Sequence, residues 1–384
     1  MPTSLLAAAE SHREWAVATL EHLVRCESPS DDPAALGRCA GELARALTEL
    51  GMQVRMHSEG GRDHLRAETG AGGAQTLLLG HYDTVWPVGQ LARMPIRREA
   101  GRLYGPGTYD MKAGIVIAML ALRALRDTQS PFGRIAMVWT ADEETGSQTS
   151  RDMIEAEARR SQAVLVLEPS LPGGAVKTAR KGVGEFHLRA TGIAAHAGVE
   201  PEKGASAVHE LARQIAAVLA LDEPGRGLTV NVGTIRGGSR ANVVAETASA
   251  EIDVRVPTLA DADRVVAAIT HLVPCDARVR LDITGGINRP PMERTPQVAA
   301  LYERARRLAA ALGRELSEGA TGGGSDGNFT AALGVPTLDG LGAEGEGAHA
   351  LHEHVRLDTL PFRAALVAGL LADGYNGGNR GIRE

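Results

Sequence analysis

Hydrophobic residues recur at helical spacing in the first part of the chain. Residues 4–27 and 33–50 carry apolar side chains three and four positions apart, and the second segment ends at Gly51, a residue that often follows a helix. This spacing predicts two opening helices. Segments 111–126 and 147–160 show the same spacing and are also predicted to be helices.

Short apolar runs lie between these helical segments. They read MQVRMH, TLLLGHYD, RIAMVWTADEE and AVLVLEP. Strands that are almost wholly apolar and alternate with helices are typical of a parallel sheet buried between two helical layers. The pattern therefore predicts an α/β fold with a mostly parallel sheet flanked by helices.

The pattern changes at about residue 179. The segments GEFHLRATG and ASAEIDVRVP alternate between polar and apolar residues, as half-exposed strands do, whereas 204–220 and 260–272 have helical spacing. From residue 289 the α/β pattern of the first part of the chain resumes, with a helix, a Gly-rich loop, a short strand and a closing helix. We therefore predict one domain built from 1–178 and 289–384, interrupted by an α+β insert, 179–288.

Length, composition and charge restrict the class of protein. A chain of 384 residues suits two domains, and 43% hydrophobic with 23% charged residues is a globular composition. The net charge of -6 is spread without a basic block, which argues against a nucleic-acid partner. Apolar runs stay below the roughly 20 residues that span a bilayer, and Glu10, Arg13 and Glu14 interrupt the place of a signal peptide. We expect a soluble cytoplasmic protein without a membrane partner.

Two further classes are disfavoured by missing motifs. Cys26, Cys39 and Cys275 are odd in number and far apart, which fits neither a disulfide framework nor paired CxxC zinc spacing, so we expect inert thiols. The early strands are not followed by GxGxxG, and GxxxxGK[ST] does not occur. A redox or nucleotide-binding protein is therefore a poor match.

Polar residues gather where the predicted strands end. His81 and Asp83 follow TLLLG, the acidic run 142–144 follows RIAMVWTA, and Glu168 follows AVLVL. Ligands of open α/β sheets bind at the carboxyl ends of the strands. We therefore expect these side chains to meet at one edge of the sheet.

Imidazole and carboxylate groups are the ligands that zinc-type ions prefer, and hydrolytic sites keep one position open for water. The candidate donors are His81, Asp110, Glu143, Glu144, Glu168 and His349. Five of them could hold two ions, which leaves one carboxylate to activate water. These residues also have structural alternatives. His81 could be a buried histidine held by hydrogen bonds, and Glu143 and Glu144 could be the solvated start of a helix. Asp110 could be a helix cap, Glu168 a carboxylate at a strand end, and Asp83 a turn residue.

A set of motifs occurs in a fixed order: GHYDTV, YGPGTYDMKAG, ADEETGS, LEPS, GIAAHAG, ANVV with DVRVP, NRPP, TGGGSDG and GAHALHEHV. From about residue 15 to 372 the chain thereby resembles the metallopeptidase family that contains glutamate carboxypeptidase, aminoacylase, acetylornithine deacetylase and succinyl-diaminopimelate desuccinylase. The TGGGSDG loop makes the bacterial glutamate carboxypeptidase branch the nearest resemblance.

The resemblance implies a role for each donor. Two Zn2+ ions, with Co2+ or Mn2+ as possible substitutes, would be held by His81, Asp110, Glu144, Glu168 and His349, with Asp110 between the ions. Glu143 would be the general base, and Asp83 would orient the imidazole of His81. His349 is preferred to His352 and His354 because the family places its ligand four residues before a glutamate, here Glu353.

The resemblance also assigns roles to the insert and to the Gly-rich loop. His196 would stabilise the oxyanion, with a turn histidine as the alternative. Arg289 and Arg255 would bind the substrate carboxylate, although Arg255 could equally be a surface strand residue. Asn242 and the backbone of residues 322–324, including Gly323 and Gly324, would add contacts. The family implies a twofold dimer through the insert, which would then be a dimerisation domain beside the catalytic domain.

The expected activity is the metal-dependent removal of a carboxyl-terminal amino acid from a peptide or an N-acyl amino acid. A deacetylase or desuccinylase of the same family is the alternative, because such enzymes would share all the metal ligands. A metal-dependent peptide-binding protein is less favoured, since such a protein would be expected to lack the base, Glu143. The residues leave open which amino acid is released, and Arg240 before ANVV departs from the family pattern.

Overall fold

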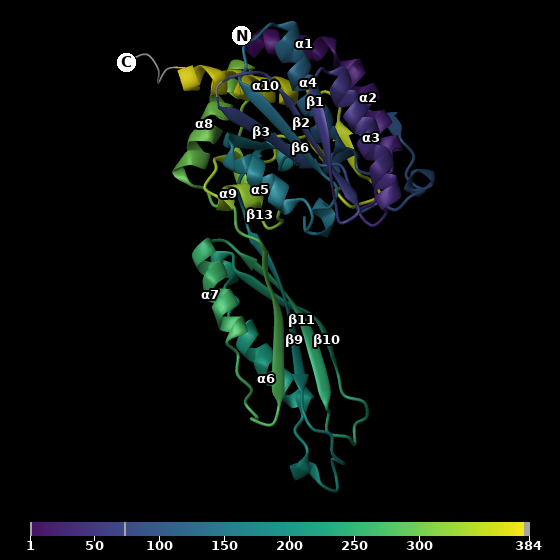
Figure 1. The fold of residues 1–384 in the computed structure, drawn as a ribbon, viewed down its shortest axis with the longest axis vertical. Coiled ribbons are helices and arrows are strands. Elements are labelled where there is room, and N and C mark those ends of the chain that lie inside the picture. The colour runs from purple at the N-terminus through teal and green to yellow at the C-terminus, as the bar shows by residue number, and fades with distance from the viewer. Residues whose placement is uncertain (1, 73, 380–384) are drawn as a thin grey trace. The chain divides into compact units, whose positions relative to one another are not determined.

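The computed structural model describes residues 2–72 and 74–379 of the chain. The chain forms two compact units. Unit 1 comprises Met1–Ala179, Arg294–Ala320 and Ser325–Glu384, and unit 2 comprises Arg180–Glu293 and Thr321–Gly324. Figure 1 shows both units and labels many of their elements.

Unit 1 is built on a six-stranded sheet with the order β1-β2-β6-β3-β7-β14. Its strands are β1 (Gln53–Glu59), β2 (Arg62–Thr69), β3 (Gln75–His81), β6 (Arg134–Thr140), β7 (Ser161–Val166) and β14 (Thr337–Leu338). β3 runs parallel to β6 and β7, and β14 runs parallel to β7. β1 and β2 form an antiparallel hairpin beside β6. The predicted α/β class with a mostly parallel sheet is confirmed.

Helices cover both faces of this sheet. They are α1 (Pro2–Ser11), α2 (Arg13–Arg25), α3 (Pro33–Glu49), α4 (Ala113–Asp127), α5 (Arg151–Arg159), α8 (Pro296–Ala311), α9 (Gly327–Ala332) and α10 (Leu360–Asn379). Leu78 of β3 packs into the large core with α1 to α4, α8 and α10. Its neighbours Leu77 and Leu79 face the other way, towards α5 and α9. A strand buried on both faces accounts for the continuous apolar run TLLLG.

Several predicted boundaries were wrong. Segment 4–27 is two helices, because the backbone at His12 leaves the helical region between α1 and α2. The helix predicted over 147–160 begins only at Arg151, after Ser147 with its left-handed φ of 56°. Strand β2 was missed. It follows β1 through Gly60 and Gly61, whose φ angles of 56° and 78° suit a two-residue hairpin turn.

Unit 2 contains a four-stranded antiparallel sheet with the order β10-β11-β9-β12. Its elements are β9 (Gly182–Thr191), α6 (Ala207–Leu219), β10 (Thr229–Gly237), β11 (Thr247–Val256), α7 (Leu259–Thr270) and β12 (Arg280–Arg289). Phe186 and Leu188 alternate with exposed residues along β9 and pack with α6 and α7 in a separate core. The alternation predicted for this segment therefore reflects a sheet with one face covered by helices.

Smaller strands complete the fold. β4 (Arg97–Glu99), β5 (Arg102–Tyr104), β15 (Gly345–Glu346) and β16 (His354–Arg356) form a second four-stranded sheet, and β8 (Val176–Arg180) pairs with β13 (Glu318–Thr321). Among the described helices, none is long and apolar enough to cross a membrane.

Candidate metal centre

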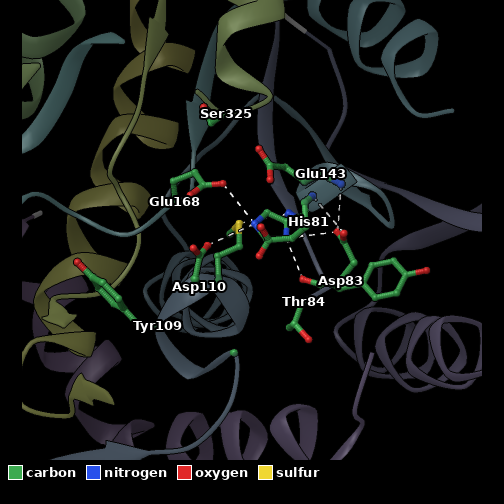
Figure 2. A network of polar contacts seen from close by, with 12 residues as sticks. His81, Asp83, Thr84, Tyr109, Asp110, Glu143, Glu168 and Ser325 are labelled. Atoms are coloured by element: carbon green, nitrogen blue, oxygen red, sulfur yellow. Dashed lines mark hydrogen bonds and ion pairs between the residues drawn. The ribbon is translucent and has the colours of Figure 1, made fainter. Parts of the chain in front are cut away.

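Three parallel strands of unit 1 bring polar side chains to one edge of the sheet. β3 ends at His81, β6 is followed by the turn Glu143–Thr145, and β7 is followed by Glu168. Because parallel strands end on the same side, these groups meet, and Figure 2 shows them around His81. The side chains of His81 and Glu168 are 1% and 10% exposed.

Two further segments supply Asp110 and His349. Asp110 lies in the turn Thr108–Lys112, directly before α4, and the backbone leaves the helical region at Asp110 and Met111. The helix cap is Lys112, so the alternative reading of Asp110 as the N-cap of α4 is wrong. His349 adopts a left-handed φ of 61°, which is uncommon for a residue other than glycine and recurs at functional sites.

Asp110 lies between two imidazoles. Its Oδ1 is 3.4 Å from His81 Nε2, and its Oδ2 is 3.3 Å from His349 Nε2. His81 Nε2 also lies 3.4 Å from Glu168 Oε1, and His349 Nε2 lies 3.2 Å from Glu144 Oε1. The donors thus form two groups, His81 with Glu168 and His349 with Glu144, which share Asp110.

These contacts change the proton affinity of the groups. Burial alone would lower the pKa of His81, but hydrogen bonds with Asp110, Asp83 and Glu168 raise it well above its usual value. Asp110, followed by Glu144, raises the pKa of His349 to about 10. Burial works to raise the pKa of Asp110, yet hydrogen bonds from His349 and His81 hold it below its usual range. The cluster therefore attracts positive charge strongly.

The donor set fits metal ions. The donor atoms of His81, Asp110 and Glu144 all lie within 4.8 Å of one another. Two ligand atoms that are each about 2.0–2.1 Å from a tetrahedral ion lie about 3.3 Å apart, which matches the spacing of 3.2–3.4 Å between nitrogen and oxygen in this cluster. Partly buried carboxylates as close as those of Asp110 and Glu144 repel one another unless a cation lies among them.

Asp83 connects the ends of β3 and β6. Its Oδ1 accepts the N–H of Glu143 at 3.2 Å, and its Oδ2 accepts the N–H of Glu144 at 3.3 Å. The Nδ1 of His81 lies 3.3 Å from Asp83 Oδ1 and 3.0 Å from the carbonyl oxygen of Asp83. This buried carboxylate therefore holds both the imidazole and the backbone of the two glutamates, as the dashed lines in Figure 2 show.

The three histidines of HALHEH take different places. His349 contacts Asp110 and Glu144. His352 is exposed. The ring centroid of His354 lies 4.9 Å from that of Tyr104, with the two rings tilted by 36°, and the Nδ1 of His354 bonds to the carbonyl oxygen of His352. His349 is therefore the histidine of this motif that the structure brings to the cluster.

Sequence reasoning missed the role of Glu353, which it used only to locate His349. The carboxylate is fully buried and accepts four N–H groups: those of Gly107 at 2.9 Å, Tyr109 at 2.8 Å, Asp110 at 3.1 Å and the Trp86 indole at 2.8 Å. Burial raises the pKa of Glu353 to about 7, although these four donors act in the opposite direction. Glu353 thereby fixes the backbone that carries Asp110.

The predicted substrate-binding residues lie in unit 2. Arg289 is 5% exposed, and a Cβ atom on Gly324 would approach its Cδ to 2.7 Å, so the glycine leaves room for this arginine. The carbonyl oxygens of Gly323 and Gly324 accept hydrogen bonds from Arg180 at 3.1 Å and 3.0 Å. Arg255 donates two hydrogen bonds, of 2.9 Å and 2.8 Å, to Asp253 on the same strand. Its guanidinium is thus already paired with a carboxylate.

His196 and Asn242 lie on adjacent segments of unit 2. The N–H of Ala197 donates to the carbonyl oxygen of Asn242 at 3.0 Å, and His196 forms a β-bridge with Val243. The Nδ1 of His196 accepts the N–H of Gly198 at 3.2 Å. In the neutral ring the proton is therefore on Nε2.

An α/β sheet with imidazole and carboxylate donors at its strand ends is typical of a metal-dependent enzyme. Residues 77–373 match the profile of Peptidase family M20/M25/M40. The chain belongs to this family and is therefore an enzyme of the metallopeptidase and amidohydrolase type.

Individual relatives agree with this assignment. Carboxypeptidase G2 of Pseudomonas sp. (strain RS-16) is 30% identical over 381 residues, which cover 96% of this chain and 91% of the relative. Succinyl-diaminopimelate desuccinylase of Dechloromonas aromatica (strain RCB) is 27% identical, with 91% and 96% covered.

Solved structures share the fold. Aminopeptidase PepT from Bacillus cereus ATCC 10987 superposes with a TM-score of 0.80 at 24% identity, covering 94% of this chain and 98% of that chain. The Bacillus subtilis YXEP protein, described as a dinuclear metal binding peptidase of the M20 family, has a TM-score of 0.69 at 14% identity, with 96% and 99% covered.

Proposed function

We propose that this protein is a dizinc hydrolase that releases a carboxyl-terminal amino acid from a peptide or an N-acyl amino acid. The observation that carries the proposal is the position of Asp110 between two donor groups, with Glu143 directly beside the donor Glu144. Such an arrangement provides five ligands for two ions and one further carboxylate. The similarity to carboxypeptidase G2 supports the choice of a carboxypeptidase-type substrate.

In this proposal His81 and Glu168 would hold one zinc ion, His349 and Glu144 would hold the other, and Asp110 would be shared between the two ions. Bound zinc lowers the pKa of water and polarises a carbonyl group. Co2+ or Mn2+ could take its place, because ligand type alone does not select among these ions.

Glu143 is the proposed general base. It takes a proton from the attacking water and later gives it to the leaving amine. Its backbone N–H is bound to Asp83, and Figure 2 shows its carboxylate turned towards the Glu168 side of the cluster. Adjacent residues in a turn point in different directions, so Glu143 can face water while Glu144 binds metal.

The residues of unit 2 are proposed to recognise the substrate. With the proton on Nε2, His196 can donate a hydrogen bond to the oxyanion that forms at the scissile carbonyl. Arg289 would bind the terminal carboxylate of the substrate through two parallel hydrogen bonds. Asn242 and the loop containing Gly323 and Gly324 would add contacts. Arg255 is a weaker candidate because Asp253 already neutralises it.

A desuccinylase is the second candidate function. It is favoured by the similarity to succinyl-diaminopimelate desuccinylases, which extends over 91% of this chain. Both activities hydrolyse an amide bond beside a carboxylate and would use the same metal-holding residues. The two candidates therefore differ only in the acyl group and the amine of the substrate.

We further propose that unit 2 is a dimerisation domain. β10 is an edge strand, and its Ile235 is 62% exposed. Helix α6 adds the exposed apolar side chains Val208 and Leu219. An exposed edge strand with apolar residues can pair with its copy about a twofold axis. A cytoplasmic location stays a prediction from the sequence.

Substrate profiling tests the proposed function. The zinc-loaded protein is incubated with N-acyl amino acids, succinylated amines and dipeptides that differ in the carboxyl-terminal residue, and the released amine is quantified. We expect hydrolysis of substrates with a free terminal carboxylate, and the preferred acyl group separates the two candidates. Absence of hydrolysis across the whole set, with two metal equivalents bound, would contradict the proposal.

A further inference from the structure

The Gly-rich motif TGGGSDG contains a carboxylate, Asp326, that binds both ends of the segment carrying Glu143 and Glu144. Asp326 is 2% exposed. Its Oδ2 accepts a hydrogen bond from Thr140 Oγ1 at 3.0 Å, and its Oδ1 accepts one from the Ser147 hydroxyl. Thr140 is the last residue of β6, and Ser147 follows the turn Glu143–Thr145. One side chain therefore joins the two ends of segment 141–146.

Segment 141–146 is held in place mainly by hydrogen bonds with side chains and less by those of a regular helix or strand. The N–H of Ala141 donates to His64 Nδ1 at 3.2 Å. Asp142 accepts the N–H of Thr149 at 2.7 Å, the Thr149 hydroxyl at 2.8 Å and the Ser150 hydroxyl at 2.6 Å. The position of the segment thus depends on a small number of buried polar contacts, each of which is costly to break.

Asp326 is itself firmly placed. The hydroxyl of the preceding residue, Ser325, donates to Asp339 Oδ2 at 2.6 Å and accepts the N–H of Gly327 at 3.1 Å. The N–H of Ser325 donates to Asn328 Oδ1 at 2.9 Å. Ser325 and Asn328 are fully buried, so water cannot replace these bonds readily. The anchor of the segment is therefore rigid.

We propose that Asp326 is a positioning residue that sets the place of Glu143 for proton transfer. This inference rests on the proposed function, in which Glu143 is the general base. Asp83 binds the middle of the segment through the N–H groups of Glu143 and Glu144, and Asp326 binds its two ends. Together they leave Glu143 little freedom to move. A general base works over a heavy-atom distance of about 2.6–3.2 Å, and a displacement of about 1 Å can cost a hundredfold in rate.

Three variants test the proposal. Asp326→Ala removes both acceptor oxygens, and Ser147→Ala removes one of the two hydroxyl donors. Asp326→Asn keeps one acceptor oxygen, and its amide N–H can donate to the other hydroxyl oxygen, because a hydroxyl group can rotate. We expect kcat to fall about tenfold to a hundredfold in Asp326→Ala and less in the other two. KM should stay within about twofold, and two equivalents of zinc should remain bound. Unchanged kcat in folded Asp326→Ala, or a loss of kcat that follows loss of zinc, would overturn the proposal.

A second measurement does not depend on activity. Hydrogen exchange of the metal-free protein is followed by mass spectrometry in peptides that cover residues 141–150 and, as a control, β3. The amides of 141–150 should exchange faster in Asp326→Ala than in the wild type, while those of β3 stay protected. If the wild type cleaves no substrate but the amides of 141–150 exchange faster in Asp326→Ala, the proposed function is wrong, while Asp326 still holds this segment in place. Unchanged exchange in Asp326→Ala would show that Asp326 does not hold the segment. If Asp326→Ala does not fold, Ser147→Ala is compared with the wild type in the same way.

Discussion

Replacing Glu353 with glutamine is expected to weaken the metal centre without altering a ligand. The carboxylate is fully buried and accepts the N–H groups of Gly107, Tyr109, Asp110 and the Trp86 indole. Glutamine has nearly the same shape, but one oxygen becomes an NH2 group that cannot accept a hydrogen bond. The two N–H groups on that side lose their acceptor and face another donor.

The size of the effect follows from this geometry. A buried N–H without an acceptor costs about 1–3 kcal/mol, so two such groups cost about 2–6 kcal/mol. This is a large share of the stability of a typical protein, about 5–15 kcal/mol, so we expect the turn Thr108–Lys112 to shift. Asp110 moves with the turn. Loss of a group that holds a metal ligand typically weakens binding 10-fold to 100-fold, or by about 1.4–2.7 kcal/mol.

The assay is a competition for zinc between the protein and a chromogenic chelator. Glu157→Gln is the matched control, because Glu157 is also a buried carboxylate, 3% exposed, but pairs with Arg66 and Arg160 instead of the Asp110 turn. We expect weaker zinc binding in Glu353→Gln only, although both variants unfold at lower denaturant concentration. Wild-type zinc affinity in Glu353→Gln, or an equal loss in the control, would show that Glu353 does not support the metal centre through the Asp110 turn.

Three further predictions concern substrate, pH and assembly. Arg289→Ala should lower kcat/KM about 10-fold to 100-fold more for a free terminal carboxylate than for the amide, since a charged hydrogen-bonded contact is lost; equal losses would exclude this role. Burial lowers the pKa of His64 below 6.5 in the folded protein. As the pH falls below about 6.5, His64 is therefore protonated more readily in the unfolded chain than in the folded one, and the folded state loses stability. His64→Gln should reduce this loss in metal-free protein, whereas replacement of its exposed cross-strand partner, His57→Gln, should not. A tagged heterodimer of His196→Ala and Glu143→Ala should recover about half of wild-type activity if the residues act across subunits, and remain inactive if they do not.

Much of the fold could be predicted because its central strands are apolar on both faces. The runs around Leu77 and Val138 are short and almost wholly apolar, as strands buried between helical layers are. β2 was missed because RDHLRAET contains charged residues, such as Arg66, whose guanidinium is paired with Glu157 in the folded chain. Pairing of this kind between distant segments leaves no periodic pattern in the sequence.

The candidate donors could be selected from the sequence because metal ligands are restricted to a few residue types, and because His81 and Glu168 stand at strand ends, whereas Asp110 and His349 stand in motifs of the resembled family. The residues that hold them were not. Glu353 acts on backbone N–H groups more than 240 positions away, and Asp326 acts on hydroxyls about 180 positions away. Backbone amides and hydroxyls occur throughout the chain, so their partners become visible only in the folded structure.

In the proposed function Glu143 is the general base of a two-metal hydrolase. The most direct test of this role measures zinc content and kcat together for Glu143→Gln, which keeps the shape of the side chain but cannot accept the proton. We expect two equivalents of zinc, as in the wild type, and a fall in kcat of at least about a hundredfold, the lower end of what a general base contributes. Wild-type kcat in this variant, or a content of one equivalent or less in the zinc-loaded wild type, would contradict the proposed function.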